Sequence, residues 1–381
     1  MKILHVMLGA FYIDNYSYQE NLLPKYHKKA GNEVEIIASL YTFDENGKGE
    51  WLPNAAKYIN EHGIPVTRLE FKKSRFARRL RRYEGLLDEL ERFSPDIIFI
   101  HGVQFCDINV IVKYLKKHEN VKVYADNHAD FSNSAKNWIS KHIQHRIIWR
   151  SCAQKINPYV KKFYGVLPAR VDFLVNEYKL PKEKVELLVM GADDEAVEKA
   201  LCSDARKRLR EKYAVGDGEF LIMTGGKIDS NKPQTILLMQ AINSLKNENV
   251  KLVVFGTVSN ELKDEFNAQL SDRVVYVGWK KSEDICAEYT AADIVAFPGL
   301  HSVLWEQAVA MGKPCIFRKI KGFDHVDLGG NCMYFEEDSV ESYHKVITDM
   351  IGNIEEIKDK AEKTGLIQFS YKKIAEKALE E

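Results

Sequence analysis

The stretch AADIVAFPGLHSVLWEQAVAMGKPCIF, residues 291–317, decides the fold class of this chain. Apolar runs at 293–299 and 313–319 are short and continuous, which is typical of buried strands. Residues 303–311 between them carry apolar side chains at helical spacing and end in a Gly-x-Pro sequence that stops a helix. A strand, a helix and a second strand in this order predict two parallel strands joined by a crossover helix.

The same alternation extends outward over the whole chain. Further strands are predicted at 2–8, 33–39, 96–102, 121–127, 219–225, 251–257 and 273–279. Helical spacing occupies 18–30, 78–93, 107–118, 234–246, 260–269 and 282–292. Two successive series of strands and helices predict an α/β protein with two Rossmann-like domains facing a central cleft, where loops at the carboxyl ends of the strands would bind a ligand.

A charged segment around Pro181 suggests the domain boundary. We therefore predict a first domain at 1–183 and a second at 184–368. The segment 369–381 has the pattern of a helix that stands apart from the preceding one, and we expect it to pack back on the first domain.

Composition limits the class of protein. With 381 residues, of which 45% are hydrophobic and 29% charged, the chain can bury two cores. Its formal net charge is zero, which gives no support for a nucleic-acid partner. The six cysteines lack paired short spacings, so we expect reduced thiols in a cytoplasmic protein and no metal site. The N-terminal apolar run reads as a first strand, and no apolar run is long enough to span a bilayer.

Two segments of the second half carry a family resemblance. The segment MTGGKIDSNKP, residues 223–233, resembles a Gly-Arg-x4-Lys-Gly segment, with Lys227 at the arginine position and Lys232 at the lysine. The segment 291–317 resembles an Ala-Asp-x4-Pro segment followed by a Glu-x7-Glu stretch, with Glu306 at the second glutamate. Together with YADNHADFSNS at 124–134, they resemble the retaining glycosyltransferases of family 4, which have the GT-B fold.

The resemblance implies a nucleotide-sugar donor on the second domain. Glu306 would bind the ribose hydroxyls, because one carboxylate can accept hydrogen bonds from both. Lys227 and Lys232 would neutralise the leaving diphosphate, which makes them catalytic as well as donor-binding. Other predicted donor contacts follow the same two strands: Gly226, His301, Ser302, Val303 and Leu304. Pro298 replaces the first glutamate of the family, so the sugar contacts of this chain differ from the family pattern.

The first domain would supply a catalytic histidine and the acceptor site. His128 matches a histidine that in the family lies beside the donor sugar, where it can hydrogen-bond a hydroxyl or move a proton. Asn15, Tyr16, Tyr18, His101 and Asp130 are the predicted acceptor contacts, and Gly9 is what remains of a glycine-rich donor-binding turn. An ordinary helix N-terminus explains the region around Tyr18 equally well.

A basic segment in the first domain suggests another partner. Residues 72–82 hold seven Lys or Arg side chains interleaved with aromatic and aliphatic ones. Basic amphipathic segments bind anionic membrane surfaces, and a solvated helix face is the alternative. Since many members of the family use lipid-linked acceptors, we expect residues 71–83 to bind the inner face of a membrane.

These observations predict a cytoplasmic glycosyltransferase that needs no cofactor. It would move a sugar, most simply from a UDP-sugar, to a glycan or lipid-linked acceptor in polysaccharide or cell-envelope synthesis, with retention. Two alternatives stay open: a sugar-nucleotide epimerase, with His128 and His301 as acid and base, and a non-catalytic glycan-binding module, for which the altered Glu-x7-Glu stretch argues.

Overall fold

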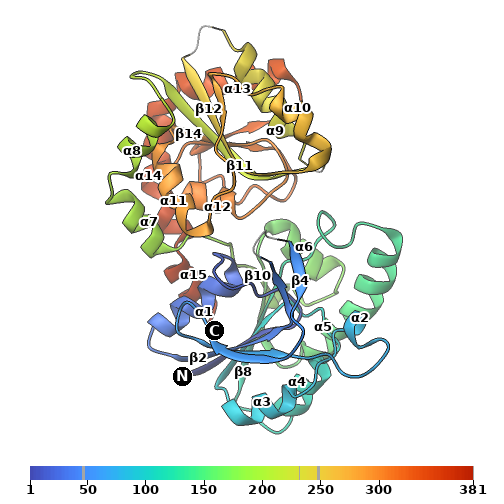
Figure 1. Cartoon of the computed structure of the whole chain (residues 1–381). Helices are drawn as coiled ribbons and strands as arrows, with labels where there is room; N and C mark the ends of the chain where they lie inside the picture. Colours follow the sequence, from blue (N-terminus) through green and yellow to red (C-terminus); the bar gives the residue numbers. More distant parts are fainter. Residues whose placement is uncertain (45–47, 231, 247–248, 381) are drawn as a thin grey trace. The chain divides into compact units, whose positions relative to one another are not determined.

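The computed structural model describes residues 1–44, 48–230, 232–246 and 249–380. The chain divides into two compact units, of which the first comprises Met1–Val189 and Lys372–Glu381 and the second Met190–Tyr371 (Figure 1). The division falls a few residues after the predicted boundary, and the C-terminal segment belongs to the first unit from residue 372 onward.

The first unit is built on an eight-stranded sheet with the order β10-β9-β8-β7-β1-β2-β6-β5, parallel except for β5. Its strands are β1 (Lys2–Met7), β2 (Glu33–Ser39), β5 (Ala56–Ile59), β6 (Pro65–Leu69), β7 (Ile97–His101), β8 (Lys122–Asn127), β9 (Val160–Gly165) and β10 (Val185–Leu187). A separate antiparallel pair is formed by β3 (Tyr41–Phe43) and β4 (Gly49–Trp51).

The helices of the first unit are α1 (Gln19–Lys29), α2 (Ala77–Leu80), α3 (Leu86–Phe93), α4 (Ile108–Leu115), the π-helix η1 (Ser140–Trp149), α5 (Arg150–Ile156), α6 (Pro168–Asn176), the 3₁₀ turn η2 (Lys182–Lys184) and α15 (Tyr371–Lys377). Side chains of α3, α4, α5 and α6 form one core with Leu4, Val6, Ile98 and Ile100 of the sheet. Residues that alternate with these in β1 and β7 point to the opposite face, which α1 and α15 cover.

The second unit has a parallel six-stranded sheet with the order β13-β12-β11-β14-β15-β16. Its strands are β11 (Phe220–Ile228), β12 (Val250–Val258), β13 (Val274–Tyr276), β14 (Ile294–Phe297), β15 (Cys315–Arg318) and β16 (Cys332–Phe335). Its helices are α7 (Asp194–Leu201), α8 (Ala205–Lys212), α9 (Gln234–Ser244), η3 (Asn260–Leu262), α10 (Lys263–Asn267), η4 (Ser282–Asp284), α11 (Ile285–Ala291), α12 (Leu304–Ala310), α13 (Val340–Gly352) and α14 (Ile354–Phe369).

Each sheet has a point at which the chain reverses its direction of travel across the strands. In the first unit the strands run outward from β1 on one side and from β7 on the other; in the second unit they do so from β11 and from β14. Ligands of open parallel sheets bind at the carboxyl ends of the strands at such a point. The strand order therefore confirms the two Rossmann-like domains and directs attention to the loops after β1, β7, β11 and β14.

The predicted helix at 78–93 is interrupted in the structure. Arg81 and Gly85 adopt left-handed backbone conformations, with φ of 51° and 73°, so helical structure is limited to α2 and α3. Arg81 turns inward, donating hydrogen bonds to the carbonyl groups of Gly9 and Gln104. The basic segment 71–83 is thus a loop that contains the single turn α2 and is closed by antiparallel pairing of Phe71 with Tyr83, and the prediction of one continuous helix at 78–93 is wrong.

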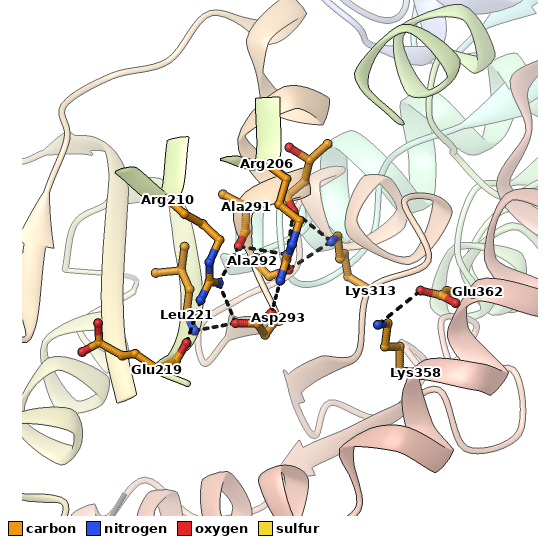
Figure 2. Close-up of polar contacts among 11 residues, drawn as sticks. Arg206, Arg210, Glu219, Leu221, Ala291, Ala292, Asp293, Lys313, Lys358 and Glu362 are labelled. Atoms are coloured by element: carbon orange, nitrogen blue, oxygen red, sulfur yellow. Dashed lines mark hydrogen bonds and ion pairs between the residues drawn. The ribbon is translucent and has the colours of Figure 1, made fainter. Parts of the chain in front are cut away.

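Asp293 and the cations around it connect four elements of the second unit, namely α8, β11, α11 and β14 (Figure 2). Its carboxylate forms ion pairs with Arg206 and Arg210 of α8, at 2.6 and 2.8 Å, and accepts the Leu221 amide of β11 at 2.8 Å. Arg206 and Lys313 also donate to the last carbonyl groups of α11, those of residues 290–292. These contacts lie at the amino ends of β11 and β14, opposite to the edge expected to bind ligands, so they support the fold.

Replacing Asp293→Asn should destabilise the second unit by about 2–3 kcal/mol, because hydrogen bonds to charged groups are worth about 1.5–3 kcal/mol each and a neutral amide retains some of them. Despite burial, the amide of Leu221 and the two arginines lower the pKa of Asp293. Its contribution is therefore present above the unfolded pKa of an aspartate and is lost as pH falls through the lower folded value.

Urea unfolding at pH 7 and pH 3 measures the loss of stability in Asp293→Asn and its pH dependence. The matched control is Asp272→Asn, which changes an exposed aspartate. Equal stability of the two variants at pH 7 would contradict this role of Asp293.

Candidate functional site

In the second unit, the loops after β11 and β14 pack directly against each other. A Cβ atom on Gly299 would lie 3.2 Å from Cγ of Lys232, so the backbone after β14 rests on the lysine stem. Gly226 has a φ of 116°, and a Cβ there would lie 3.4 Å from Cδ1 of Leu304 at the start of α12. The predicted donor residues of the two strands are thus brought together by the strand order.

The two predicted lysines lie in different environments. Lys227 is within β11, 72% of its side chain is exposed, and its Nζ lies 3.2 Å from Asp229. Lys232 precedes α9 and is half-buried, and burial lowers the pKa of its ammonium group. A desolvated ammonium group gains more from an anionic ligand than an exposed one, because solvent screens it less.

The start of α12 differs from the prediction. The helix begins at Leu304 with Val303 as its N-cap, and neither Val303 nor Ser302 caps it with a side chain. The Ser302 carbonyl accepts the Trp305 amide at 3.0 Å, so Ser302 belongs to the preceding turn. Ser302 therefore does not cap the helix, and this helix of seven residues provides no anion site by itself.

Glu306 is fully buried at the base of this loop and accepts from two histidines. Its Oε1 lies 2.8 Å from Nε2 of His301 and 2.7 Å from Nε2 of His325, and all three side chains are at most 5% exposed. Burial alone would raise the pKa of Glu306, but the two histidines outweigh it and hold the pKa far below its usual range. Its Oε2 has no hydrogen-bond partner among the residues that the structure describes.

His301, Glu306 and His325 also have the donor set of a metal site, with ligand atoms within 4.8 Å of one another. Their spacing favours hydrogen bonds instead. Two ligands bound at about 2.0–2.1 Å to a tetrahedral zinc ion lie about 3.3 Å apart, whereas Glu306 Oε1 is within 2.8 Å of both nitrogens. The cluster is therefore described as a carboxylate that orients two imidazoles.

In the first unit, His128 lies directly after β8 with a quarter of its side chain exposed. Its Nε2 faces two carboxylates, Asp126 at 3.5 Å and Glu20 at 3.8 Å. Burial lowers the pKa of His128, but the charges of Glu20 and Asp126 outweigh that effect and raise it. The ring therefore keeps its proton to a higher pH than an ordinary histidine.

Two of the predicted acceptor residues are buried behind this surface. His101 has no exposed surface and its ring lies 2.9 Å from Asp126. The prediction that its side chain contacts the acceptor is therefore wrong, because a ligand cannot reach it. Asp130 accepts from the Ser132 amide at 2.6 Å and pairs with Arg170 at 3.0 Å. The charge of Asp130 is thus balanced by Arg170, and its binding of the acceptor stays a prediction.

The loop after β1 carries the remaining predicted residues. Asn15 is exposed in a left-handed conformation, and the rings of Tyr16 and Tyr18 stack at a centroid distance of 5.1 Å. A Cβ on Gly9 would lie 1.9 Å from the Gly102 carbonyl oxygen, so contact between two loops already requires this glycine. Donor binding by Gly9 and acceptor binding by Asn15, Tyr16 and Tyr18 stay predictions.

Sequence reasoning missed Glu20 as a neighbour of His128 in the first unit and His325 as a neighbour of Glu306 in the second. Glu20 lies in α1, far from His128 in the sequence, and His325 lies in a loop between β15 and β16. Neither position stands in a motif, so only the tertiary structure reveals them.

Residues 219–353 match the family model described as Glycosyl transferases group 1. These residues form a group 1 glycosyl transferase domain. The match covers most of the second unit, including β11, β14 and α12 with their loops. The chain is accordingly a glycosyltransferase, as the resemblance implied. A search of curated protein sequences found no match.

The fold of the whole chain is shared with solved structures. A glycosyltransferase from Rickettsia africae is 17% identical with a TM-score of 0.70, over 99% of this chain and 96% of that one. Anabaena HepE in complex with UDP is 16% identical with a TM-score of 0.68, over 99% and 98%. A UDP-GlcNAc 2-epimerase from Neisseria meningitidis is 14% identical with a TM-score of 0.65, over 100% and 99%. The GT-B fold of this glycosyltransferase is thereby confirmed.

Removing the buried carboxylate should destabilise the second unit of the glycosyltransferase. Glu306→Ala leaves the N–H groups of two buried imidazoles without their acceptor, and breaking a buried charged contact costs about 3–5 kcal/mol. Glu306→Gln keeps an amide oxygen for them and should cost about 1–3 kcal/mol. Urea unfolding of both variants measures the difference. Equal stabilities of the Ala and Gln variants would show that the two histidines do not depend on Glu306.

Proposed function

We propose that this glycosyltransferase moves a sugar from a UDP-sugar to a glycan or lipid-linked acceptor, with retention, in polysaccharide or cell-envelope synthesis. The observation that carries the proposal is the contact between the β11 and β14 loops of the second unit. It gathers an exposed and a half-buried lysine, Lys227 and Lys232, at the carboxyl edge where parallel sheets bind ligands. UDP is favoured as the nucleotide because Anabaena HepE, of the same fold, is a complex with UDP.

The donor diphosphate would bind at the two lysines. Negative charge grows on the diphosphate as it leaves, and preorganised cations stabilise this charge more than they stabilise the bound substrate. Gly226, Gly299 and the 301–304 turn would surround it. Because Glu306 is fully buried, we propose that it orients His301 and does not bind the ribose hydroxyls as the resemblance implied. His301, held by Glu306 Oε1, would present a fixed imidazole beside the donor.

His128 is the proposed catalytic group of the first unit. Because Nε2 faces carboxylates, Nδ1 is the nitrogen left to donate a hydrogen bond to a sugar hydroxyl or the diphosphate. Retention would follow the route in which the leaving diphosphate takes the proton of the acceptor hydroxyl on the face from which it departs. That route needs no protein nucleophile beside the sugar.

Incubation with a panel of nucleotide sugars, with and without glycan and lipid-linked acceptors, tests the proposal. Nucleotide release that requires an acceptor, with a glycosylated product, would support it. A new sugar nucleotide formed without acceptor would mean an epimerase, and glycan binding with no turnover would mean a binding module.

In the same assay, Lys227→Met and Lys232→Met should each lower turnover by about 10²–10³, because each removes a preorganised charge and keeps the apolar stem. The double variant should fall short of the product of the two effects, since both lysines act on one charge. Lys263→Met, an exposed lysine of α10, is the matched control. A single variant within twofold of the wild type would remove that lysine from the site.

We also propose that the glycosyltransferase attaches to the inner face of a membrane through its first unit. None of the described helices combines the length and the hydropathy needed to cross a bilayer, so attachment would be peripheral. The basic loop exposes Phe76 and several cations. The π-helix η1 exposes Ile143 and Ile147, and Trp138 and Ile139 are exposed just before it. Apolar insertion and charge attraction act together in stable peripheral binding.

Co-sedimentation with phosphatidylglycerol vesicles should capture the protein, and high salt or neutral lipid should release it. Ile147→Glu should weaken this binding about tenfold or more, because it places a charge among these exposed apolar side chains. Trp279→Ala, which removes an exposed aromatic ring of the second unit, should have no effect. Binding that ignores lipid charge and Ile147 alike would reject the membrane proposal.

A further inference from the structure

Three histidines and an aspartate form a buried row on one face of the first sheet. Leu4 and Val6 of β1 point into the main core, so His5 between them points to the opposite face. The same alternation in the neighbouring strands places His101 of β7 and Asp126 of β8 on that face. His27 reaches the row from α1, and all four side chains are at most 2% exposed.

Hydrogen-bonding distances connect the row from end to end. The Ala375 carbonyl oxygen of α15 lies 2.9 Å from His27 Nε2, and His27 Nδ1 lies 3.0 Å from His5 Nε2. His5 Nδ1 then lies 2.9 Å from His101 Nε2. The last contact, between His101 Nδ1 and Asp126 Oδ2 at 2.9 Å, is an ion pair without hydrogen-bond alignment, and it is too close for two unprotonated atoms.

The two ends of this row determine how many protons it holds. A carbonyl oxygen and an ionised carboxylate only accept hydrogen bonds, so each of the four contacts needs a proton from an imidazole. Three neutral imidazoles carry one N–H each and leave one contact without a proton. The row therefore holds one extra proton, which makes one imidazole an imidazolium and balances the charge of Asp126.

The extra proton belongs at His101. Burial lowers the pKa of His27 to about 4 and that of His5 well below the ordinary value, with the neighbouring histidines adding to the effect at His5. Burial would raise the pKa of Asp126, but His101 and His128 outweigh it and keep that pKa far below its usual range. The charged pair is thus His101 with Asp126, next to each other in the row.

Asp126 is also the contact between this row and His128. The Gln19 side-chain amide donates to Oδ2 at 2.9 Å, and the Gly102 backbone amide donates to Oδ1 at 3.1 Å. His128 Nε2 lies 3.5 Å from Oδ2. The other charges that act on His128 are Glu20 of α1, which favours its protonated form, and Arg170 of α6, which opposes it.

We propose that Asp126 is a positioning residue for His128, and that an imidazolium at His101, hydrogen-bonded through His5 and His27 to α15, keeps Asp126 ionised. The charge of Asp126 then attracts Nε2 of His128 and retains its proton, which leaves Nδ1 for the ligand. The catalytic consequence rests on the proposed role of His128; the proton count of the row does not.

The sign of the pH effect follows from this arrangement. Activity that needs protonated His128 is present below its folded pKa and is lost as pH rises through it. Asp126→Asn removes one of the two carboxylates that raise this pKa. It should therefore move the loss of kcat to lower pH by about one unit, since an opposite charge in contact shifts a pKa by about 1–3 units. KM for the donor should stay unchanged, because Asp126 is buried and its side chain cannot reach a ligand.

Asp126→Asn also has a distinct effect on the buried row. The asparagine amide can donate to His101 Nδ1, and Gln19 can turn its own amide to accept from it. All three histidines can then be neutral with every contact satisfied, so this variant should fold. His27→Gln is the matched control, because the glutamine amide donates to Ala375 and accepts from His5, and the imidazolium at His101 is retained.

Long-range ¹H–¹⁵N spectra of the histidine-labelled full chain, recorded from pH 6 to pH 9, test the inference directly. Wild type and His27→Gln should show one buried imidazolium in the row, and Asp126→Asn should show none. The His128 signal, identified by its loss in His128→Gln, should titrate about one pH unit lower in Asp126→Asn than in wild type. The signal of His118, a partly exposed histidine outside the row, should be the same in all variants.

An all-neutral row in wild type, or an unchanged His128 titration in Asp126→Asn, would overturn the inference. Normal turnover of His128→Gln would instead reject the proposed catalytic role of His128. The spectroscopic result would stand in that case, so the two failures are distinguishable.

Discussion

The reversal of strand order in each sheet is the constraint on which the sites of this protein depend. Parallel strands that depart in opposite directions from β1 and β7, or from β11 and β14, leave two loops side by side with no crossover helix between them. In the second unit this brings Lys232 against Gly299 and Gly226 against Leu304. In the first it brings Gly9 against Gly102, where a side chain on either loop would collide with the backbone of the other.

Behind these loops, both units bury a carboxylate that is compensated by histidines. Asp126 pairs with His101, and Glu306 accepts from His301 and His325. A buried charge without a partner costs several kcal/mol, so these clusters keep their geometry only while each buried charge is compensated. The cost explains why the carboxylates that orient the candidate site are themselves hidden from a ligand, while Lys227 and part of His128 remain exposed.

The two clusters differ in what they connect. Glu306 orients imidazoles within one loop region, and its second oxygen has no hydrogen-bond partner within the described part of the chain. Asp126 stands between a surface histidine and a row of buried imidazoles that ends on the backbone of α15. The C-terminal segment thus completes the hydrogen bonding of the first sheet, which gives a physical reason for its return to the first unit.

The sequence alone determined the alternating strands and helices, and hence two parallel sheets, because periodicity and chain stops are local properties. It also indicated His128 and the loops around Lys227, Lys232 and Glu306, since these positions stand in a recognisable order. It did not reveal that Arg81 and Gly85 would break the helix at 78–93, because a buried guanidinium group that binds the loop after β1 is a tertiary contact. Nor could spacing show that Glu306 and His101 are buried, or that His5, His27 and His101 meet. Only the tertiary structure decided these points, because charge compensation in a low-dielectric interior depends on which strands are neighbours.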